Sequence, residues 1–222
     1  LQSAYSSIGM IEQYLVVIES LPEISISQAA QDSLTYNAAF MKFSEMDYVV
    51  AKRSFDIYIK RFKSGFFLNA AHYYNAISSL NIGDTLAAVL NYEKVVKTGV
   101  TSFQEKALVF LARRSYNAGD YEKSNMYYTK LLDYISSNSI KREAIIRLMT
   151  GNEFNDKTVA LDYAKQVIDL EKKDNWLLSR AYIIIARHEF NSGNYAKSKS
   201  TFEKVSKLSL FDEGAEAKYY LA

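Results

Sequence analysis

"AGDYEKSNMYYTKLL", residues 118–132, returns further along the chain as "SGNYAKSKSTFEKV", residues 192–205. Each stretch opens with a small residue and Gly, continues with Asp or Asn and then Tyr, and carries Lys, Ser and an aromatic residue at matching offsets. Glycine followed by a short polar residue is typical of a turn that ends one helix and begins another. Two copies of this turn, each followed by a helical pattern, predict a chain built from repeats.

The turn can be followed along most of the chain. Aligned copies recur at intervals of 36 to 38 residues, at Met46, Gly83, Gly119, Asn155 and Gly193. The next residue is always Asp or Asn, whose side-chain oxygen can accept a hydrogen bond from the free N–H groups of a starting helix. We therefore predict a helix N-cap just after each turn, at Asp47, Asp84, Asp120, Asp156 and Asn194.

Small residues flank each turn at fixed distances. Seven residues before it stand Ala39, Ala76, Ala112, Leu148 and Ala186, four alanines in five, and five residues after it stand Ala51, Ala88, Ser124, Ala160 and Ser198. The small residues allow two antiparallel helices to cross closely. Two further positions, larger in all but one case, continue the stripe of a helix with one buried face. Nine residues after the turn stand Phe55, Tyr92, Tyr128, Ala164 and Phe202, and twelve residues after it stand Tyr58, Val95, Leu131, Val167 and Val205.

The predicted unit of helix, tight turn and helix resembles the tetratricopeptide repeat. The resemblance is clearest in "ALVFLARRSYNAGDYEKSNMYYTKLLDY" (107–134) and "AYIIIARHEFNSGNYAKSKSTFEKVSKL" (181–208), and it covers roughly residues 33–222. It implies an all-α, right-handed superhelix of about five helix pairs with partial units at both ends. The period is longer than the family's usual 34 residues, and the usual proline after the second helix is missing apart from Pro22.

These repeats predict a single solenoid domain over residues 1–222. Its parts are a partial unit at 1–22, a connection at 23–32, repeats at 33–65, 66–101, 102–137, 138–173 and 174–210, and a partial unit at 213–222. The fourth repeat is degenerate, with Lys157 in place of a Tyr and Ala164 in place of an aromatic residue. Because the last segment stops within a predicted helix, we expect a piece of a longer repeat protein.

Composition argues against several partner classes. Lys and Arg total 27 against 25 Asp and Glu, which gives a net charge of +2 and no general basic field for nucleic acid or an anionic membrane. Cysteine is absent, and no apolar run approaches the roughly 18 residues needed to insert this segment into a membrane. One Pro and eight Gly in 222 residues favour helix throughout.

Catalysis is not expected. The two histidines, His72 and His188, fall about three repeats apart and so cannot share a metal ion. The phosphate-binding G-x-x-x-x-G-K-[ST], the metal-binding H-E-x-x-H and the nucleophile motif G-x-S-x-G are all missing. We therefore expect no enzyme activity, no metal and no cofactor.

The first helices of a tetratricopeptide array line its concave face, and the resemblance implies that this face binds a protein or peptide. The residues 13, 10, 6 and 3 positions before each turn form one stripe along the first helix. This stripe is aromatic and apolar in the early repeats and basic in the later ones. Such a stripe suits a peptide with apolar anchors and an acidic segment or a C-terminal carboxylate. The alternative is that the arginines pair with acidic residues of neighbouring helices, or face a later part of the chain. The predicted partner-binding residues are Tyr36, Phe40, Tyr73, Ile77, Lys106, Val109, Arg113, Tyr116, Arg142, Arg180, Ile183 and Arg187.

The predicted function is a non-catalytic scaffold for protein partners. The family's clamp for acidic C-termini needs Lys and Asn where this chain has Tyr36, Phe40, Tyr73 and Ile77, so that clamp is not expected. The chain also resembles the long tetratricopeptide proteins of Bacteroidetes-type bacteria and the periplasmic ones of envelope assembly, which implies a periplasmic or outer-membrane-associated location. The alternative is the sensor or adaptor arm of a cytoplasmic signalling protein or transcription regulator.

Overall fold

The computed structural model describes residues 5, 11–21, 26–97, 102–135 and 137–222. Within these ranges the regular structure is helical and includes no β-strand, and consecutive helices pack on one another. This confirms the predicted all-α fold. The chain divides into two compact units, Leu1–Ala107 and Leu108–Ala222, whose boundary falls inside helix α7.

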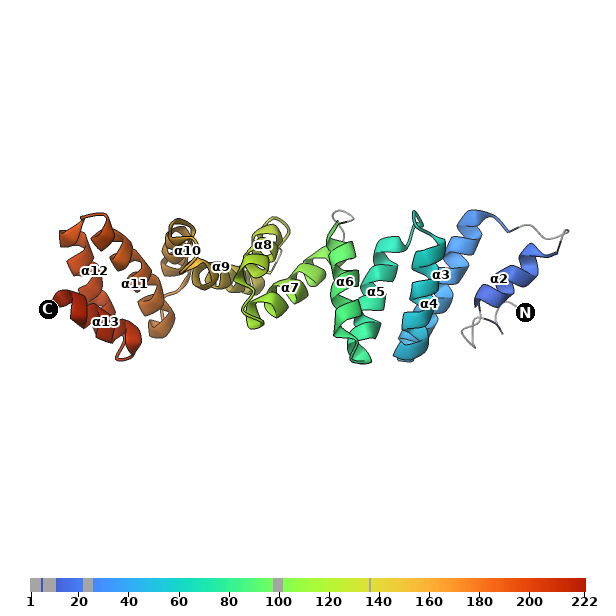
Figure 1. Ribbon diagram of the computed structural model, residues 1–222, viewed down its shortest axis with the longest axis horizontal. Coiled ribbons are helices and arrows are strands. Elements are labelled where there is room, and N and C mark those ends of the chain that lie inside the picture. The colour runs from blue at the N-terminus through green and yellow to red at the C-terminus, as the bar shows by residue number, and fades with distance from the viewer. Residues whose placement is uncertain (1–4, 6–10, 22–25, 98–101, 136) are drawn as a thin grey trace. The chain divides into compact units, whose positions relative to one another are not determined.

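The helices of the first unit follow one another in chain order (Figure 1). They are α2 (Ile11–Glu19), α3 (Gln28–Ser44), α4 (Tyr48–Arg61), α5 (Leu68–Asn81), α6 (Thr85–Lys97) and the start of α7 (Ser102–Asn117). Those from α2 to α6 each pack on the next. Helix α3 begins inside the segment 23–32 that we predicted to be a connection. The Ser27 side chain caps it by accepting a hydrogen bond from the Ala30 N–H at 3.2 Å, and the residues that follow are good helix formers.

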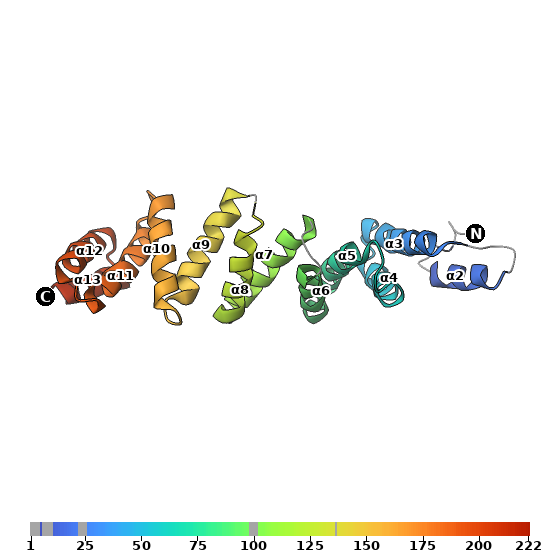
Figure 2. The same ribbon diagram turned by 90° about the horizontal axis from the view of Figure 1, so that it is seen from above.

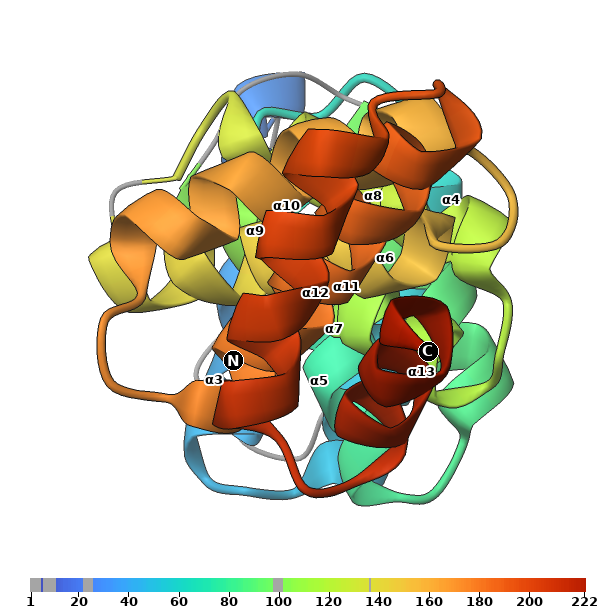
Figure 3. The same ribbon diagram turned by 90° about the vertical axis from the view of Figure 1, so that its left-hand side faces the viewer.

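The second unit holds the end of α7 and the helices that follow it. These are α8 (Tyr121–Leu132), α9 (Asn138–Asn152), α10 (Lys157–Leu170), α11 (Asn175–Asn191), α12 (Tyr195–Leu208) and α13 (Asp212–Leu221). Seen from above, α9 and α10 lie side by side (Figure 2). Helix α13 packs on both α11 and α12, as the view of Figure 3 shows.

Four of the five predicted turns share one geometry. Met46, Gly83, Gly119 and Gly193 all have positive φ, between 62° and 82°. At the third turn the Gly119 N–H donates to the Tyr116 carbonyl and the Asp120 N–H to the Ser115 carbonyl, both at 3.0 Å, which is the Schellman ending of a helix. Gly119 is suited to this turn because it has no Cβ to oppose a positive φ.

The residue after each turn starts the next helix. The Asp47, Asp84 and Asp120 carboxylates accept hydrogen bonds from the amides three residues on, as predicted for N-caps. Asn194 occupies the same position, but its side chain makes no capping hydrogen bond, so the prediction was wrong in that detail. Its backbone N–H still bonds to the Glu189 carbonyl, which closes the turn without help from the side chain.

The fourth turn is different. Asn155 does not have a positive φ, and the Asp156 N–H bonds to the Asn152 carbonyl four residues earlier, at 2.9 Å. Asp156 nevertheless caps α10, accepting from the amides of Thr158 and Val159. The degenerate repeat therefore keeps its helix pair and its cap while its turn takes another path.

The small residues lie where the paired helices cross, as predicted. The Ser124 hydroxyl donates to the Ala112 carbonyl of the facing helix at 3.2 Å, and Ser198 donates to Ala186 in the same way at 3.1 Å. A serine at the crossing is thus small enough for close packing, and its buried hydroxyl group has a hydrogen-bond partner. All ten predicted crossing residues are no more than 1 % exposed: Ala39, Ala51, Ala76, Ala88, Ala112, Ser124, Leu148, Ala160, Ala186 and Ser198.

Enlarging one crossing residue should destabilise the second unit. Ala112→Leu places extra methyl groups against α8, and overpacking of this kind costs about 1 to 3 kcal/mol. Chemical denaturation would measure the change in the free energy of unfolding. Ala196→Leu, the same substitution at an exposed position of α12, is the control. A denaturation midpoint that Ala112→Leu leaves unchanged would contradict the close crossing.

Candidate binding site

One edge of the predicted concave stripe packs inside the core. Tyr36 and Tyr73 are each 8 % exposed and Ile183 is 2 % exposed. The Tyr36 ring stacks on the Phe67 ring with centroids 4.4 Å apart, because the residue ten before each turn faces the start of the next helix pair. These three side chains offer little surface to a partner, whereas Phe40 and Ile77 are half-buried.

The basic residues of the stripe are placed against other side chains of their own unit. In the first unit, the Lys106 ammonium lies 6.0 Å from the centre of the Tyr73 ring. In the second, Arg113 on α7 forms a two-point ion pair with Glu143 on α9, with N–O distances of 2.7 and 2.5 Å. Arg142 on α9 pairs with Glu171, which precedes α11.

Both of these carboxylates are held in their charged form. The Arg113 guanidinium keeps the pKa of the Glu143 carboxyl below its usual range. Burial and the hydrogen bond to Glu143 raise the pKa of the Tyr128 hydroxyl, which donates to that carboxylate at 2.9 Å. The Lys173 backbone N–H and then the Arg142 guanidinium lower the pKa of Glu171 to about 2. These pairs are therefore intact at neutral pH.

The last two arginines share one buried carboxylate. Glu153 lies in the turn after α9 and is 8 % exposed. Its two oxygens accept from Arg180 at 2.7 Å and from Arg187 at 2.8 Å, both on α11. Arg180 also pairs with Glu213 and Arg187 with Glu216, both on α13. Three carboxylates thus surround two guanidinium groups, so these arginines carry no surplus positive charge.

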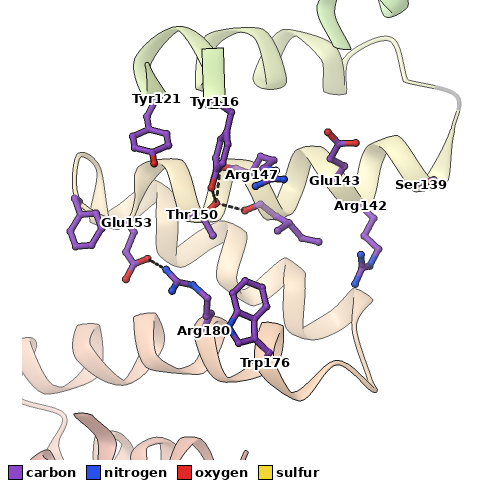
Figure 4. Close-up of a pocket in the computed structure, with 12 residues that line it drawn as sticks. Tyr116, Tyr121, Ser139, Arg142, Glu143, Arg147, Thr150, Glu153, Trp176 and Arg180 are labelled. Carbon is purple, nitrogen blue, oxygen red and sulfur yellow. Dashed lines mark hydrogen bonds and ion pairs between the residues drawn. The ribbon is translucent and has the colours of Figure 1, made fainter. Parts of the chain in front are cut away.

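A hollow of about 740 Å³ lies in the second unit beside this network (Figure 4). The end of α7, the start of α8, one face of α9, the turn after α9 and the start of α11 surround it. One wall is held together by the Tyr116 hydroxyl and the Thr150 hydroxyl, 2.9 Å apart. The lining residues most relevant to binding are Tyr116, Arg147, Thr150, Phe154, Trp176 and Arg180.

Arg147 differs from the other arginines of this hollow. Its guanidinium carbon lies 4.2 Å from the centre of the Tyr116 ring, a close cation–π contact. Arg142 and Arg180 have carboxylate partners, but no carboxylate oxygen in the described part of the chain comes within 4.0 Å of the Arg147 nitrogens. Arg147 is therefore oriented by an aromatic ring while its charge has no directly bonded carboxylate.

The sequence stripe did not include Arg147. Counting back from the fourth turn gives Arg142, Ile145, Met149 and Asn152 on α9, and the structure buries the last three. Met149 belongs to the same core cluster as Ala164, at the position where other repeats carry an aromatic residue. With that side of α9 turned inward, Arg147 and Thr150 face the hollow. The alanine at position 164, where the other repeats have an aromatic residue, was a sequence signal that the core of this repeat packs differently from theirs.

The histidines have separate environments. His72 is buried in the first unit, where its Nδ1 lies 2.7 Å from the Asn91 side-chain oxygen and burial lowers its pKa. His188 is exposed in the second unit. Among the described residues, no three His, Asp or Glu side chains gather in a way that could hold a metal ion. A helix long and apolar enough to cross a bilayer is likewise not found there.

The described hairpins fit one structural class. All of them have buried residues at the helix crossing, and all but the fourth have a left-handed turn residue and an aromatic side chain nine residues after the turn. The chain folds as tetratricopeptide-like helix pairs. No protein-family model matches it, and neither does any curated protein.

Two solved structures of tetratricopeptide proteins are similar to this chain. One, from Parabacteroides merdae ATCC 43184, is 16 % identical with a TM-score of 0.48, over 88 % of this chain and 74 % of that one. The other, the TPR2AB-domain:pHSP90 complex of yeast Sti1, is 11 % identical with a TM-score of 0.36, over 99 % of this chain and 92 % of that one.

Proposed function

We propose that this protein is a non-catalytic scaffold that binds a protein partner through a peptide segment seated in the hollow of the second unit. Arg147 is the observation that carries the proposal. A guanidinium can donate two parallel hydrogen bonds to one carboxylate, and stacking on Tyr116 fixes its plane before the partner arrives. Less conformational entropy is then lost on binding.

The walls of the hollow define the rest of the partner's chemistry. Trp176 is 54 % exposed, and Phe154 also presents most of its ring to solvent. Exposed aromatic residues beside a cation that has no directly bonded carboxylate favour a peptide with an acidic group and a neighbouring apolar side chain. The acidic group is either an Asp or Glu side chain or a terminal carboxylate.

Several residues predicted from the sequence serve this hollow. Tyr116, Arg142 and Arg180 line it directly. Arg113 and Arg187 do not line the hollow, but each forms an ion pair with a carboxylate that does. Arg113 pairs with Glu143, and Arg187 pairs with Glu153. In this proposal Arg113 and Arg187 are positioning residues, and Arg147 makes the contact with the partner.

The cellular setting is a separate part of the proposal. The resemblance of the sequence to periplasmic tetratricopeptide proteins supports a role in bacterial envelope assembly, and the arm of a cytoplasmic regulator is the alternative. Fractionation of native cells into periplasm, outer membrane and cytoplasm tests this directly. Recovery of the native protein in the cytoplasmic fraction would contradict the envelope setting without affecting the binding site.

Charge reversal at Arg147 tests the binding site. Peptides selected on the wild-type chain from a random 12-residue display library should lose affinity for Arg147→Glu by about tenfold to a hundredfold, since hydrogen bonds to charged groups contribute about 1.5 to 3 kcal/mol. Arg114→Glu, an exposed arginine of α7 outside the hollow, is the matched control. If the library yields no binders, or if both variants bind the peptides as the wild type does, the proposal is wrong.

A further inference from the structure

The fourth turn lacks an aromatic contact that three other turns have. At those turns an aromatic residue of the first helix packs edge-on against the Tyr that begins the second helix. The ring pairs are Phe43–Tyr48 at 5.8 Å, Tyr116–Tyr121 at 5.2 Å and Phe190–Tyr195 at 5.4 Å between centroids. The fourth turn has Asn152 and Lys157 at these positions, so both members of the pair are replaced together.

An exposed aromatic residue stands in this turn instead. Phe154 is 80 % exposed, although the residue before it, Glu153, is buried and held by Arg180 and Arg187. The ion network fixes the backbone directly beneath Phe154. A large apolar side chain is therefore presented to solvent from a well-anchored turn, which suits an anchor point for a partner.

Phe154 lines two hollows of the second unit. Besides the hollow that contains Arg147, it borders one of about 410 Å³ between the same turn, α11 and α13. Glu153 and Phe154 are the residues common to both linings, so Phe154 belongs to the wall between the hollows. The second hollow is also lined by Lys157, Ile184, His188 and Tyr220.

Each hollow contains one cation without a bonded carboxylate. Arg147 is that cation in the first, and Lys157 is that cation in the second, as judged over the part of the chain that the structure describes. Lys157 is the first residue of α10, where the helix dipole disfavours a positive charge by about 0.3 to 1 kcal/mol. A lysine here does not help its own helix, but its charge and the helix N-terminus both attract an anion.

We propose that the two hollows form one bipartite site for an extended acidic peptide, an inference that rests on the proposed function and specifies its ligand. An apolar side chain of the peptide packs on Phe154. A carboxylate on one side of it bonds to Arg147, and a carboxylate on the other side meets Lys157. The peptide class that fits is an apolar residue with acidic residues on both sides.

Charge complementarity distinguishes this peptide from other anions. Glu143 and Glu153 line the first hollow, and Glu153 also borders the second, so a continuous row of phosphates would pass close to fixed negative charge. A peptide can place single carboxylates at the two cations and neutral groups between them. The exposed ring of Phe154 also favours an apolar contact, which a phosphate backbone does not supply.

Selection and truncation test the bipartite site. A random 12-residue display library selected on the intact chain should enrich peptides with acidic residues on both sides of an apolar residue. The best such peptide, made with a fluorescent label, should bind about fivefold more tightly than the same peptide with the acidic residues of one side replaced by serine. Phe154→Ser and Lys157→Glu should each weaken the full peptide by about fivefold, through lost apolar burial and reversed charge respectively.

Matched controls separate these effects from general ones. Leu210→Ser removes another highly exposed apolar side chain, and Lys199→Glu reverses an exposed charge on α12; neither should change the affinity. Further, the peptide's acidic residues that meet Lys157 should give no gain in Lys157→Glu, so this variant should bind the full peptide no more tightly than the peptide with those residues replaced by serine. Circular dichroism of each variant should match the wild type, since all four positions are exposed.

The outcomes distinguish the two proposals. Peptides that depend on Arg147 but carry acidic residues on one side only, or that bind Phe154→Ser and Lys157→Glu with wild-type affinity, overturn the bipartite site and leave the proposed function standing. Failure of the library to yield any peptide overturns both. Enriched peptides that lack acidic residues altogether also overturn both.

Discussion

Replacing Glu153 by alanine is expected to lower the free energy of unfolding by about 3 kcal/mol, because removal of one partner from a buried ion pair leaves the other charge uncompensated. Glu153 bonds to Arg180 and Arg187 and is 8 % exposed. The value lies at the low end of the range for buried pairs, because the two arginine side chains are 29 % and 35 % exposed and keep Glu213 and Glu216 as partners.

Urea denaturation of the whole chain measures this loss. Glu203→Ala removes an exposed carboxylate of α12 that forms no ion pair within the described part of the chain, and it should be nearly neutral. Glu153→Gln keeps the shape and removes the charge, so a loss similar to that of Glu153→Ala would assign the effect to the ion pairs. If Glu153→Ala unfolds at the same urea concentration as the wild type, the network does not stabilise the turn.

The repeat architecture could be predicted because its signals are local. A residue with positive φ, a capping Asp and two small residues twelve positions apart all lie within one helix pair. Gly119, Asp120, Ala112 and Ser124 show each of them, and the structure places all four as predicted. The departures at α3 and at Asn194 are equally local. They concern how a helix begins, which depends on whether a particular side chain accepts a backbone hydrogen bond.

The candidate site could be predicted only in part, because its electrostatics depend on partners far apart in the sequence. Arg113 and Glu143 are separated by 30 residues. The sequence pattern therefore left open whether such arginines bind a partner or pair with acidic residues of neighbouring helices. The repeat pattern does not distinguish Glu153, yet it is buried and pairs with two arginines of α11. Arg147 lies outside the stripe that the repeat predicts, yet it lines the hollow.

Some of this information was nevertheless present in the fourth repeat. Lys157 and Ala164 both break the pattern there, and each break corresponds to a structural change. Lys157 borders the second hollow, and Met149 packs in the core cluster that contains Ala164. A degenerate repeat within a regular array is thus a place to search for binding residues. The substitutions that weaken the pattern replace aromatic side chains that pack in most of the other repeats, and their removal can leave a hollow that a partner occupies.

The second large effect is expected at the aromatic position nine residues after the turn. Phe202 is 1 % exposed, and its ring stacks on that of Tyr220 with centroids 4.7 Å apart. Phe202→Ala should lower the free energy of unfolding by about 3 to 5 kcal/mol, the cost of lost burial plus the cavity left behind. Urea denaturation measures it, and Tyr219→Ala, at an exposed position of α13, is the control.

The fourth repeat already has alanine at the position equivalent to Phe202. Ala164 occupies the equivalent position in the fourth repeat and is fully buried without a large side chain, because Met149 turns inward in the same cluster. In the repeat of Phe202 the residue equivalent to Met149 is Arg187, whose guanidinium is committed to Glu153 and Glu216 and so does not fill the core. Alanine is therefore tolerated at one copy of this position and should be costly at the other. A loss below about 1 kcal/mol for Phe202→Ala would show that the neighbouring helices collapse to fill the space.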